Sequence, residues 1–369
     1  MNLKPANTER LPIPNEGIME IAPYKPGKSQ SKPGVKVSKL SSNENPLGPS
    51  PLASKAFVES AGSLHRYPEG GAPRLCAAIG EVFGLKPEQI VCGAGSDELI
   101  GLLIHAYAKA GDDILISRHG FLMYKIYAQG RGVDTIFAPE TDLRTDVDAM
   151  LAALTPRTKL VFVANPNNPT GSYISKTEMD RLHAGLPSDV LLVIDDAYAE
   201  YVEEPDYSTG SEMVESAHNV VMLRTFSKIY GLSALRLGWA YAPPHVVDVL
   251  HRVRGPFNVS TPAIEAGIAA VRDVKFVEKT RSFNNQWLAW MSKEIAQLGL
   301  IAHPSIANFV LVEFSGSEQA KAANDFLMER GLIVREVGAY NLPCHLRISI
   351  GLEGENKAVI AALKEFLSA

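Results

Sequence analysis

The sequence predicts an α/β protein with a large domain, whose mostly parallel sheet is sandwiched by helices, and a smaller α+β domain at the C-terminal end. Two observations predict the large domain. Between about residues 89 and 245, short β-rich runs alternate with segments of helical periodicity, which is typical of parallel sheets. These runs lack polar alternation, as expected of strands that are covered on both faces. A second group of strand-like runs after residue 262 predicts the smaller domain.

The predicted elements follow in order along the chain. Residues 1–50 are rich in proline, glycine and asparagine, which predicts an extended arm that is ordered only where it lies on another part of the protein. Residues 51–260 are expected to form the large domain, with helices at 97–111 and 146–154 and strands at 89–93, 113–117, 134–139, 159–165, 190–196, 219–225 and 238–243. Residues 261–369 are expected to form the small domain, with a long helical stretch, strands at 307–314, 331–337 and 345–351, and a closing helix at 357–368.

The composition argues against several classes of protein. The 369 residues are 46 % hydrophobic and 21 % charged, and the net charge of −5 gives no sign of a nucleic-acid partner. Cys76, Cys92 and Cys344 form no CxxC pair, so we predict neither a disulfide framework nor a metal site, and we expect a reducing, cytoplasmic location. The N-terminus lacks the apolar segment of a secretory signal, and no apolar run reaches the roughly 18 residues of a membrane helix.

Unusual polar residues follow the predicted strands, where ligands of such sheets gather. After the first strand, Gly95 frees the backbone and Ser96 is a good N-cap for an apolar-periodic helix. The free N–H groups of a helix N-terminus bind phosphate, although a well-capped helix without any ligand explains the same pattern. Asp97 and Glu98 fit the first turn and would repel a phosphate unless their side chains point away.

Two further strands end in polar residues. The turn NPNNPTG follows the fourth strand, and in it Asn168 could offer an amide to a ring substituent or simply form part of a loop. Asp195 ends a fully apolar strand, where an unpaired carboxylate is costly, so we expect it to have a cationic partner. A helix N-cap is the alternative for this aspartate. Tyr198, three residues later, can point the same way.

The segment RTFSK brings a lysine to the end of the next strand. Burial there should lower the pKa of Lys228, as an amine nucleophile requires, whereas a side chain that extends into solvent is the alternative. Arg236 keeps its charge and suits a phosphate. A phosphate cup, a carboxylate for a pyridinium nitrogen, hydrogen-bond donors for a ring oxygen and a Schiff-base lysine are together what pyridoxal 5'-phosphate (PLP) requires.

These segments resemble a known family over nearly the whole chain. The chain is similar to the fold-type-I PLP-dependent aminotransferases, and within them to the histidinol-phosphate aminotransferases. The resemblance is carried by IAPYKPG (21–27), SSNENPLGPSP (41–51), RYPEGG (66–71), GAGSDE (93–98), NPNNPTG (165–171), DDAY (195–198), RTFSK (224–228), LRLG (235–238), ANF (307–309) and LRISIG (346–351). The lysine segment and NPNNPTG are shared by many aminotransferases, whereas the first three motifs point more narrowly.

The resemblance implies roles for the matching residues. Lys228 would bind PLP covalently and shuttle the proton between Cα and C4′, Asp195 would pair with the pyridinium nitrogen, and Tyr198 would bond the ring O3′ together with Asn168. The phosphate would be held by Gly95, Ser96, Asp97, Thr225, Ser227 and Arg236. One segment, SRHGFLMYKIY, departs from the family pattern. Counting back from Tyr124 places Phe121 at the position that stacks on the ring, with His119 as the alternative.

The resemblance also implies partners and substrates. Tyr67 would reach into the neighbouring subunit's site, which makes the enzyme a homodimer, and Tyr24, Arg335 and Arg347 would meet substrate anions beside Asn168. The expected reaction converts L-histidinol phosphate and 2-oxoglutarate to imidazole-acetol phosphate and L-glutamate, in histidine biosynthesis. An aromatic amino-acid aminotransferase is the main alternative. A phosphothreonine-type decarboxylase and a catalytically silent, cofactor-binding regulator are two others.

Overall fold

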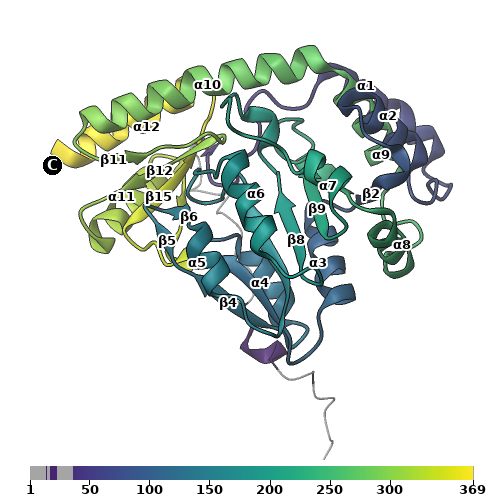
Figure 1. Ribbon diagram of the computed structural model, residues 1–369. Helices are drawn as coiled ribbons and strands as arrows, with labels where there is room; N and C mark the ends of the chain where they lie inside the picture. Colours follow the sequence, from purple (N-terminus) through teal and green to yellow (C-terminus); the bar gives the residue numbers. More distant parts are fainter. Residues whose placement is uncertain (1–13, 15–16, 23–35, 369) are drawn as a thin grey trace, which may run out of the picture.

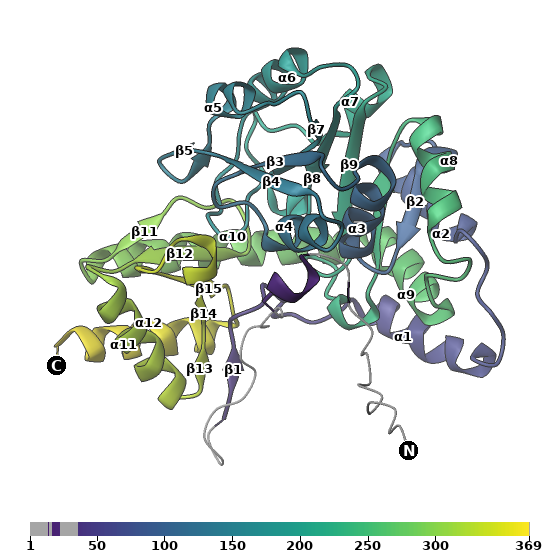
Figure 2. The ribbon, with the colours of Figure 1, turned by 90° about the horizontal axis from the view of Figure 1, so that it is seen from below.

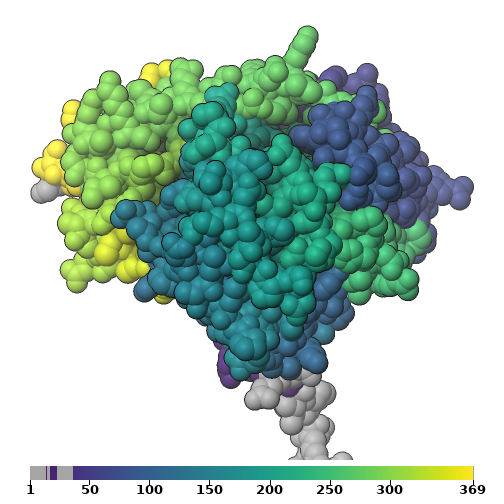
Figure 3. All heavy atoms as spheres, in the orientation of Figure 1, coloured from purple at the N-terminus to yellow at the C-terminus, as the bar shows by residue number. Residues whose placement is uncertain are grey.

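The computed structural model describes residue 14, residues 17–22 and residues 36–368, and its chain folds into two packed units (Figure 1). Most of the predicted arm, including Tyr24, lies outside the described residues. In the space-filling view the small C-terminal unit, yellow to light green, packs directly against the teal part of the large unit (Figure 3). None of the described helices is long and apolar enough to cross a membrane.

A seven-stranded sheet forms the centre of the large unit. The strands, in spatial order, are β2 (Ile90–Gly93), β10 (Gly238–Tyr241), β9 (Val220–Thr225), β8 (Leu191–Asp195), β7 (Thr158–Ala164), β3 (Asp113–Ser117) and β4 (Asp134–Ala138). Only β10 runs antiparallel to its neighbours. All seven predicted strands are therefore confirmed, and the polar residues that follow the parallel strands meet at one edge of the sheet.

Helices cover both faces of this sheet because successive strand residues point to opposite sides. On β8, Leu192 and Ile194 join one apolar core, while Val193 joins the other. Figure 2 shows α5, α6 and α7 on one side of the sheet and α3 and α4 on the other. The helices of this unit are α1 (Pro51–Glu59), α2 (Pro73–Phe83), α3 (Ser96–Tyr107), α4 (Leu122–Gln129), α5 (Val147–Ala152), α6 (Lys176–Gly185), α7 (Ser211–Ser216), α8 (Pro244–Val253) and α9 (Thr261–Arg272).

The small unit has an antiparallel sheet of four strands. In spatial order they are β11 (Ile301–His303), β12 (Phe309–Glu313), β15 (His345–Ser349) and β14 (Arg335–Glu336). One face packs on the helices α10 (Val274–Gln297), α11 (Ser317–Glu329) and α12 (Glu353–Ser368). The other face turns to the large unit, where Leu311 of β12 packs near Leu122 and Leu143. The two strands at 307–314 and 345–351 and the closing helix are confirmed, and β11 is an addition.

The predicted single strand at 331–337 is wrong in one respect, because it divides into two. Its first part, β13 (Leu332–Ile333), pairs in parallel with β1 (Ser38–Lys39) from the predicted arm. Its second part, β14, pairs with β15 instead. The chain changes partner at Val334, which is buried. The residue pattern of one segment cannot reveal two partners, because strand pairing depends on which distant segments lie beside it. Elsewhere in the chain, β5 (Glu140–Thr141) and β6 (Arg144–Thr145) pair to form a short antiparallel ribbon.

Helices α9 and α10 link the two units. α9 packs on α1 and α2, and its Ile264 belongs to a core of the large unit. α10 runs along both units, about 36 Å for 24 residues (Figure 1). Its Val277 lies in the same large-unit core, whereas its Met291 and Ile295 lie in the small-unit core. We therefore propose that the boundary between the units falls inside α10 rather than at residue 260.

Candidate active site

A cavity of about 400 Å³ opens where β7, β8 and β9 end. It gathers residues that the sequence separates by up to 194 positions, from Ser42 to Arg236. Ten of the predicted site residues line it, namely Ser96, Asp97, Phe121, Asn168, Asp195, Tyr198, Thr225, Ser227, Lys228 and Arg236. Ser42 and Glu44, from the segment that follows β1, complete the wall. The arrangement confirms that these strand ends converge. The local contacts of each residue then indicate what that residue can do.

Lys228 lies in this cavity, three residues beyond the end of β9. Its Nζ donates to the Ser42 carbonyl oxygen at 3.2 Å and lies 5.6 Å from the centre of the Tyr198 ring. Burial, with the nearby positive charge of Arg347, lowers the pKa of Lys228 to about 7. An amine with this pKa is largely neutral just above pH 7 and can act as a nucleophile. The side chain does not extend into solvent, so the alternative weighed for this lysine does not apply.

Asp195 is buried at the end of β8, with its two carboxylate oxygens in different situations. Oδ2 accepts a hydrogen bond from the Tyr124 hydroxyl at 2.7 Å. Oδ1 is buried and has no hydrogen-bond partner among the described residues. Burial raises the pKa of this carboxyl to about 6, and the Tyr124 hydrogen bond opposes that rise. Asp195 caps no helix. Its unpartnered Oδ1 can accept a hydrogen bond from a cationic N–H group of a ligand.

Asn168 and Tyr198 also line the cavity and are held by other parts of the fold. Asn168 Oδ1 accepts from the Arg347 guanidinium, whose Nη2 also donates to the Ser41 carbonyl oxygen at 2.7 Å. The Tyr198 hydroxyl accepts from Asn43 Nδ2 at 2.9 Å. Arg347 belongs to β15, so the small unit contacts a residue of the cavity wall, Asn168, through one buried arginine.

The N-terminus of α3 forms one end of the cavity. Gly95 precedes the helix with φ of 86°, and no side chain caps the first turn. Glu98 turns back to the Ala94 N–H at 2.6 Å, and Asp97 accepts from the Tyr127 hydroxyl at 2.8 Å. Both carboxylates are therefore held by neighbouring groups, and the helix N-terminus is left able to bind an anion.

Close backbone contact shapes this end of the cavity. A Cβ atom at Gly238 would lie 2.2 Å from the Ser96 nitrogen, so only glycine lets β10 approach α3 this closely. Arg236 lies beside it, with Nη1 donating to Ser227 Oγ at 3.3 Å and to the Ser233 carbonyl oxygen at 3.0 Å. Thr225 Oγ1 accepts from the Ser227 N–H at 3.1 Å. A guanidinium, two hydroxyls and a helix N-terminus therefore surround the same space.

The structure separates the two candidates for the stacking aromatic. Phe121 lines the cavity at the start of α4 and packs edge-on against Tyr124, with ring centres 5.7 Å apart. His119 is buried elsewhere, and its Nδ1 bonds the Tyr340 carbonyl oxygen at 2.6 Å. Phe121 is therefore the residue in position to contact a ring in this cavity.

Four of the predicted residues that the structure describes are not part of the cavity wall: Gly95 and Arg347 adjoin it through Ser96 and Asn168, and Tyr67 and Arg335 lie further away. Tyr67 is 82 % exposed and stacks on Phe257, with ring centres 4.7 Å apart. Arg335 pairs with Arg347 across β14 and β15, which places both arginines on the face of the small sheet that turns to the large unit. The position of Tyr67 is compatible with a role toward another subunit, and its role stays a prediction.

Sequence reasoning missed three contributors. In the sequence analysis Tyr124 served only to locate Phe121, yet its hydroxyl donates a hydrogen bond to Asp195. The carbonyl oxygen of Ser42 and the amide of Asn43 hold Lys228 and Tyr198. The signal for the last two was present in the sequence, because SSNEN is a run of polar residues before a proline-rich stretch; in the structure Asn43 has a positive φ of 56°.

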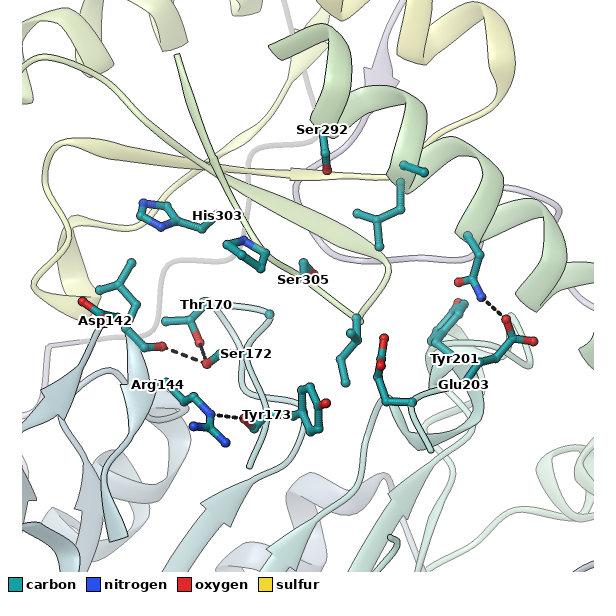
Figure 4. A pocket seen from close by; sticks show the side chains of 18 residues that line it. Asp142, Arg144, Thr170, Ser172, Tyr173, Tyr201, Glu203, Ser292, His303 and Ser305 are labelled. Atoms are coloured by element: carbon teal, nitrogen blue, oxygen red, sulfur yellow. Dashed lines mark hydrogen bonds between the residues drawn. The ribbon is translucent and has the colours of Figure 1, made fainter. Parts of the chain in front are cut away.

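A larger cavity of about 700 Å³ lies between the two units (Figure 4). Arg144 on its wall bonds the Tyr173 carbonyl oxygen at 2.6 Å and pairs with Glu178. His303 of the small unit lies across from Asp142 and Arg144. No lysine lines this cavity, so the smaller one carries the candidate chemistry.

The sequence profile of the aminotransferase class I and II family matches residues 35–363. The chain belongs to this family. This aminotransferase is 54 % identical to the histidinol-phosphate aminotransferase of Paramagnetospirillum magneticum over 360 residues, which are 97 % of this chain and 99 % of the relative. The corresponding enzyme of Rhodospirillum centenum is 53 % identical, over 96 % of this chain and 99 % of the relative. The resemblance predicted from the motifs is confirmed.

Solved structures agree with the assignment of this chain to the aminotransferase family. A histidinol-phosphate aminotransferase from Sinorhizobium meliloti, solved in complex with pyridoxal-5'-phosphate, superposes with a TM-score of 0.85 at 29 % identity. The match covers 90 % of this chain and 91 % of that one. An aspartate aminotransferase from Thermus thermophilus shares the fold, with a TM-score of 0.79 at 22 % identity and coverage of 91 % and 92 %. The predicted fold-type-I architecture is thus confirmed.

Proposed function

We propose that this chain is a PLP-dependent aminotransferase that converts L-histidinol phosphate and 2-oxoglutarate to imidazole-acetol phosphate and L-glutamate, in histidine biosynthesis. The observation that carries the proposal is the pair formed by Lys228 and Asp195 in one cavity. The lysine has its pKa lowered to about 7, and the buried aspartate has one oxygen without a partner among the described residues. The names of the most similar relatives support the choice of substrate.

The residues in the cavity fit PLP. The unpartnered Oδ1 of Asp195 would accept from the pyridinium N–H, which satisfies an otherwise costly buried atom. The α3 N-terminus, with Ser227 and Arg236, would hold the phosphate through charge-assisted hydrogen bonds. Phe121 would stack on the ring, and Asn168 and Tyr198 would bond its O3′.

When bound, PLP supplies an electron sink for the negative charge that develops on the carbon beside the substrate's amino group. Lys228 Nζ would hold the cofactor covalently and then move the proton away from that carbon and back. The lowered pKa of Lys228 keeps a large neutral fraction available near pH 7. Asp195, fixed by Tyr124, would keep its charge against the ring nitrogen. The Ser42 carbonyl oxygen orients the lysine amine.

Recognition of the substrates rests on arginine. Histidinol phosphate carries a phosphate of about −1.5 to −2 charge near neutral pH and has no α-carboxylate, whereas glutamate brings carboxylates. The planar guanidinium binds either group bidentately. Arg347 is buried beside Asn168, and Arg335 lies across from it on the same face of the sheet. Tyr24 of the arm, which lies outside the described residues, is proposed to add a hydroxyl donor.

A comparison of kcat/KM for histidinol phosphate, histidinol, phenylalanine and tyrosine, each with 2-oxoglutarate, tests the substrate. Histidinol phosphate should give the highest value. Arg347→Ala and Arg335→Ala should each lower it roughly 10- to 1000-fold, for the loss of one or two charge-assisted contacts. Histidinol, which lacks the phosphate, should be a poor substrate and respond little to Arg335→Ala. A clear preference for phenylalanine would replace the proposal with an aromatic aminotransferase.

We further propose a cytoplasmic homodimer in which Tyr67 completes the partner's site. The exposed aromatic pair of Tyr67 and Phe257 supports an interface, since such side chains favour burial against another surface. The three cysteines, all unpaired, fit a reducing compartment. Mixing Tyr67→Ala subunits with Lys228→Ala subunits tests the shared site. A mixed dimer would have one site with both defects and one with neither, so activity should return. If Tyr67 acts within its own subunit, mixing restores nothing.

A further inference from the structure

Three ligand-type side chains meet on the small unit, outside the cavity of Lys228. His303 Nε2 lies 3.0 Å from Glu313 Oε2, and His345 Nε2 lies 3.6 Å from the same oxygen. One possible ligand atom from each residue can be chosen so that all three lie within 4.8 Å of one another. The two imidazole rings have centres 5.3 Å apart and are tilted by 32°. Two nitrogens and one carboxylate oxygen therefore converge on one point.

The sheet explains why these three residues meet. Glu313 and His345 are direct partners across β12 and β15, so their side chains share one face. Ile301 of β11 is the partner of Glu313, and His303, two residues further along β11, points to the same face as Ile301. The ligands thus come from three adjacent strands whose positions are fixed by backbone hydrogen bonds. A site on strands is more rigid than one on loops.

An ordinary ion pair accounts for only part of this cluster. A hydrogen bond between His303 and Glu313 satisfies those two residues. His345, with only 11 % of its side chain exposed, lies at ion-pair distance from Glu313, but its two ring nitrogens are buried without a hydrogen-bond partner among the described residues. Buried imidazole nitrogens normally have a partner, so this histidine calls for one.

We propose that His303, Glu313 and His345 form a binding site for a first-row divalent cation, with Zn²⁺ as the best fit. Two histidines and one carboxylate are an established ligand set for Zn²⁺, which binds nitrogen and carboxylate oxygen at about 2.0–2.2 Å. Tetrahedral bonds of that length place ligand atoms about 3.4 Å apart, so the separations of 3.0 and 3.6 Å already fit. The third pair, between the two histidines, lies within 4.8 Å.

The surroundings leave room for a fourth ligand. His303 also lines the cavity of about 700 Å³ between the units, so water or a small anion can reach the ion from that side (Figure 4). A three-residue set with an open position is the arrangement of zinc sites that exchange a ligand. Binding would also join β11, at the edge of its sheet, to β12 and β15 through side chains.

The test is a calorimetric titration of the dialysed holoenzyme with ZnCl₂, followed by metal analysis after gel filtration. One Zn²⁺ per chain is expected. Glu313→Gln and His303→Gln should each weaken binding at least about 100-fold, whereas His218→Gln, at an exposed histidine outside the cluster, should not change it. Circular dichroism and the visible absorbance of bound PLP check that each variant is folded.

Co²⁺ provides a second readout that does not depend on activity. Four-coordinate Co²⁺ in the site should give visible d–d bands, and these should disappear in Glu313→Gln. Zinc binding that persists in the double variant of His303→Gln and Glu313→Gln would overturn the proposal. So would binding that is lost in Cys76→Ser/Cys92→Ser, because the two buried sulfurs lie 3.8 Å apart and could bind the ion instead. Absence of any binding by the unaltered holoenzyme would also overturn it.

Discussion

Asp195 and Asp196 are consecutive residues at the end of one strand, and their surroundings differ. Asp195 has one oxygen bonded to Tyr124 and one without a partner among the described residues. Both oxygens of Asp196 accept hydrogen bonds, from the Tyr207 hydroxyl and from the Gly210 N–H, each at 3.0 Å. Burial raises the pKa of both carboxyls, to about 6 and about 7. A raised pKa therefore does not tell the two residues apart, whereas the unpaired oxygen does.

A similar contrast separates two cationic side chains, one in the next strand and one just after its end. Arg224 is buried in β9, pairs with Glu200 at 3.0 Å, and lies 4.8 Å from the Phe83 ring centre. Lys228 has a carbonyl oxygen as its hydrogen-bond acceptor and faces the cavity. Alternation of side chains along β8 and β9 sends Asp196 and Arg224 to the face opposite Asp195. One face of the strand ends thus holds an ion-paired network, in which Arg224 Nε still lacks a hydrogen-bond partner among the described residues, and the other face holds groups that line the cavity.

The largest expected effect tests the face that lines the cavity. Lys228→Ala should lower transamination by several orders of magnitude, because the nucleophile and the proton carrier disappear together. PLP should still bind, but without a covalent link, as seen by its release on denaturation even after treatment with borohydride, which fixes the cofactor to the unaltered protein. The exposed Lys321→Ala variant is the matched control and should behave as the unaltered protein. Near-normal turnover in Lys228→Ala would remove the basis for the contrast.

On the ion-paired face, the effect should appear in stability instead. Arg224→Met should lower the free energy of unfolding by roughly 3–5 kcal/mol, because it leaves Glu200 buried and unpaired. Adding Glu200→Gln should recover much of that loss. Urea unfolding of the two variants measures both values. Activity per folded molecule should stay unchanged, and a selective loss of kcat in Arg224→Met would show that the network has a catalytic part.

The two neighbouring aspartates allow a direct comparison with one chemical change. Asp195→Asn should slow exchange of the substrate's α-proton roughly 10- to 100-fold, for the loss of one charge-assisted hydrogen bond. Asp196→Asn should leave exchange unchanged and lower the unfolding free energy by about 1–3 kcal/mol, because an amide disturbs its two hydrogen bonds. Proton exchange followed by NMR and urea unfolding separate the two outcomes. Equal effects of both changes on exchange would abolish the distinction.

The smallest effect concerns pH. An ordinary lysine has a pKa of about 10.4, so its neutral fraction keeps rising well above pH 9. Because the pKa of Lys228 is lowered to about 7, first by burial and then by Arg347, covalent capture of PLP by the apoenzyme should rise through pH 7 and level off near pH 8. Arg347→Met should move the midpoint upward, since a nearby positive charge is removed. Stopped-flow absorbance measures the rate, and a continuous rise to pH 10 would contradict the lowered pKa.

The sequence predicted the central sheet well because each strand carries its own signal. The apolar runs and the polar residues that follow them sufficed to place Asp195, Lys228 and Arg236 at one edge. Partnerships between distant segments could not be predicted in this way. Nothing local to residues 331–337 reveals that β13 pairs with β1, and nothing near Tyr124 indicates its bond to Asp195.

The proposed metal site shows the same limit more sharply. The prediction of no metal site rested on the wide spacing of this chain's cysteines. In most zinc motifs the cysteine ligands are close together in sequence. His303, Glu313 and His345 span 42 positions and meet only because β11, β12 and β15 are adjacent. A ligand set distributed over three strands leaves no sequence pattern, so only the register of the sheet brings it to notice.

The pairing of β1 with β13 has a consequence for how this chain can be cut or fused. Residues 38–39 anchor the segment to the small unit, and within four further residues Ser42 and Asn43 reach Lys228 and Tyr198 in the large unit. A fragment that starts at α1 would lose these contacts while keeping every long helix. Expression fragments and circular permutants should therefore retain residues 36–50. In a split version divided at the start of α1, the segment with residues 36–50 would be a separate peptide. Its rebinding could be followed as recovery of the cofactor site.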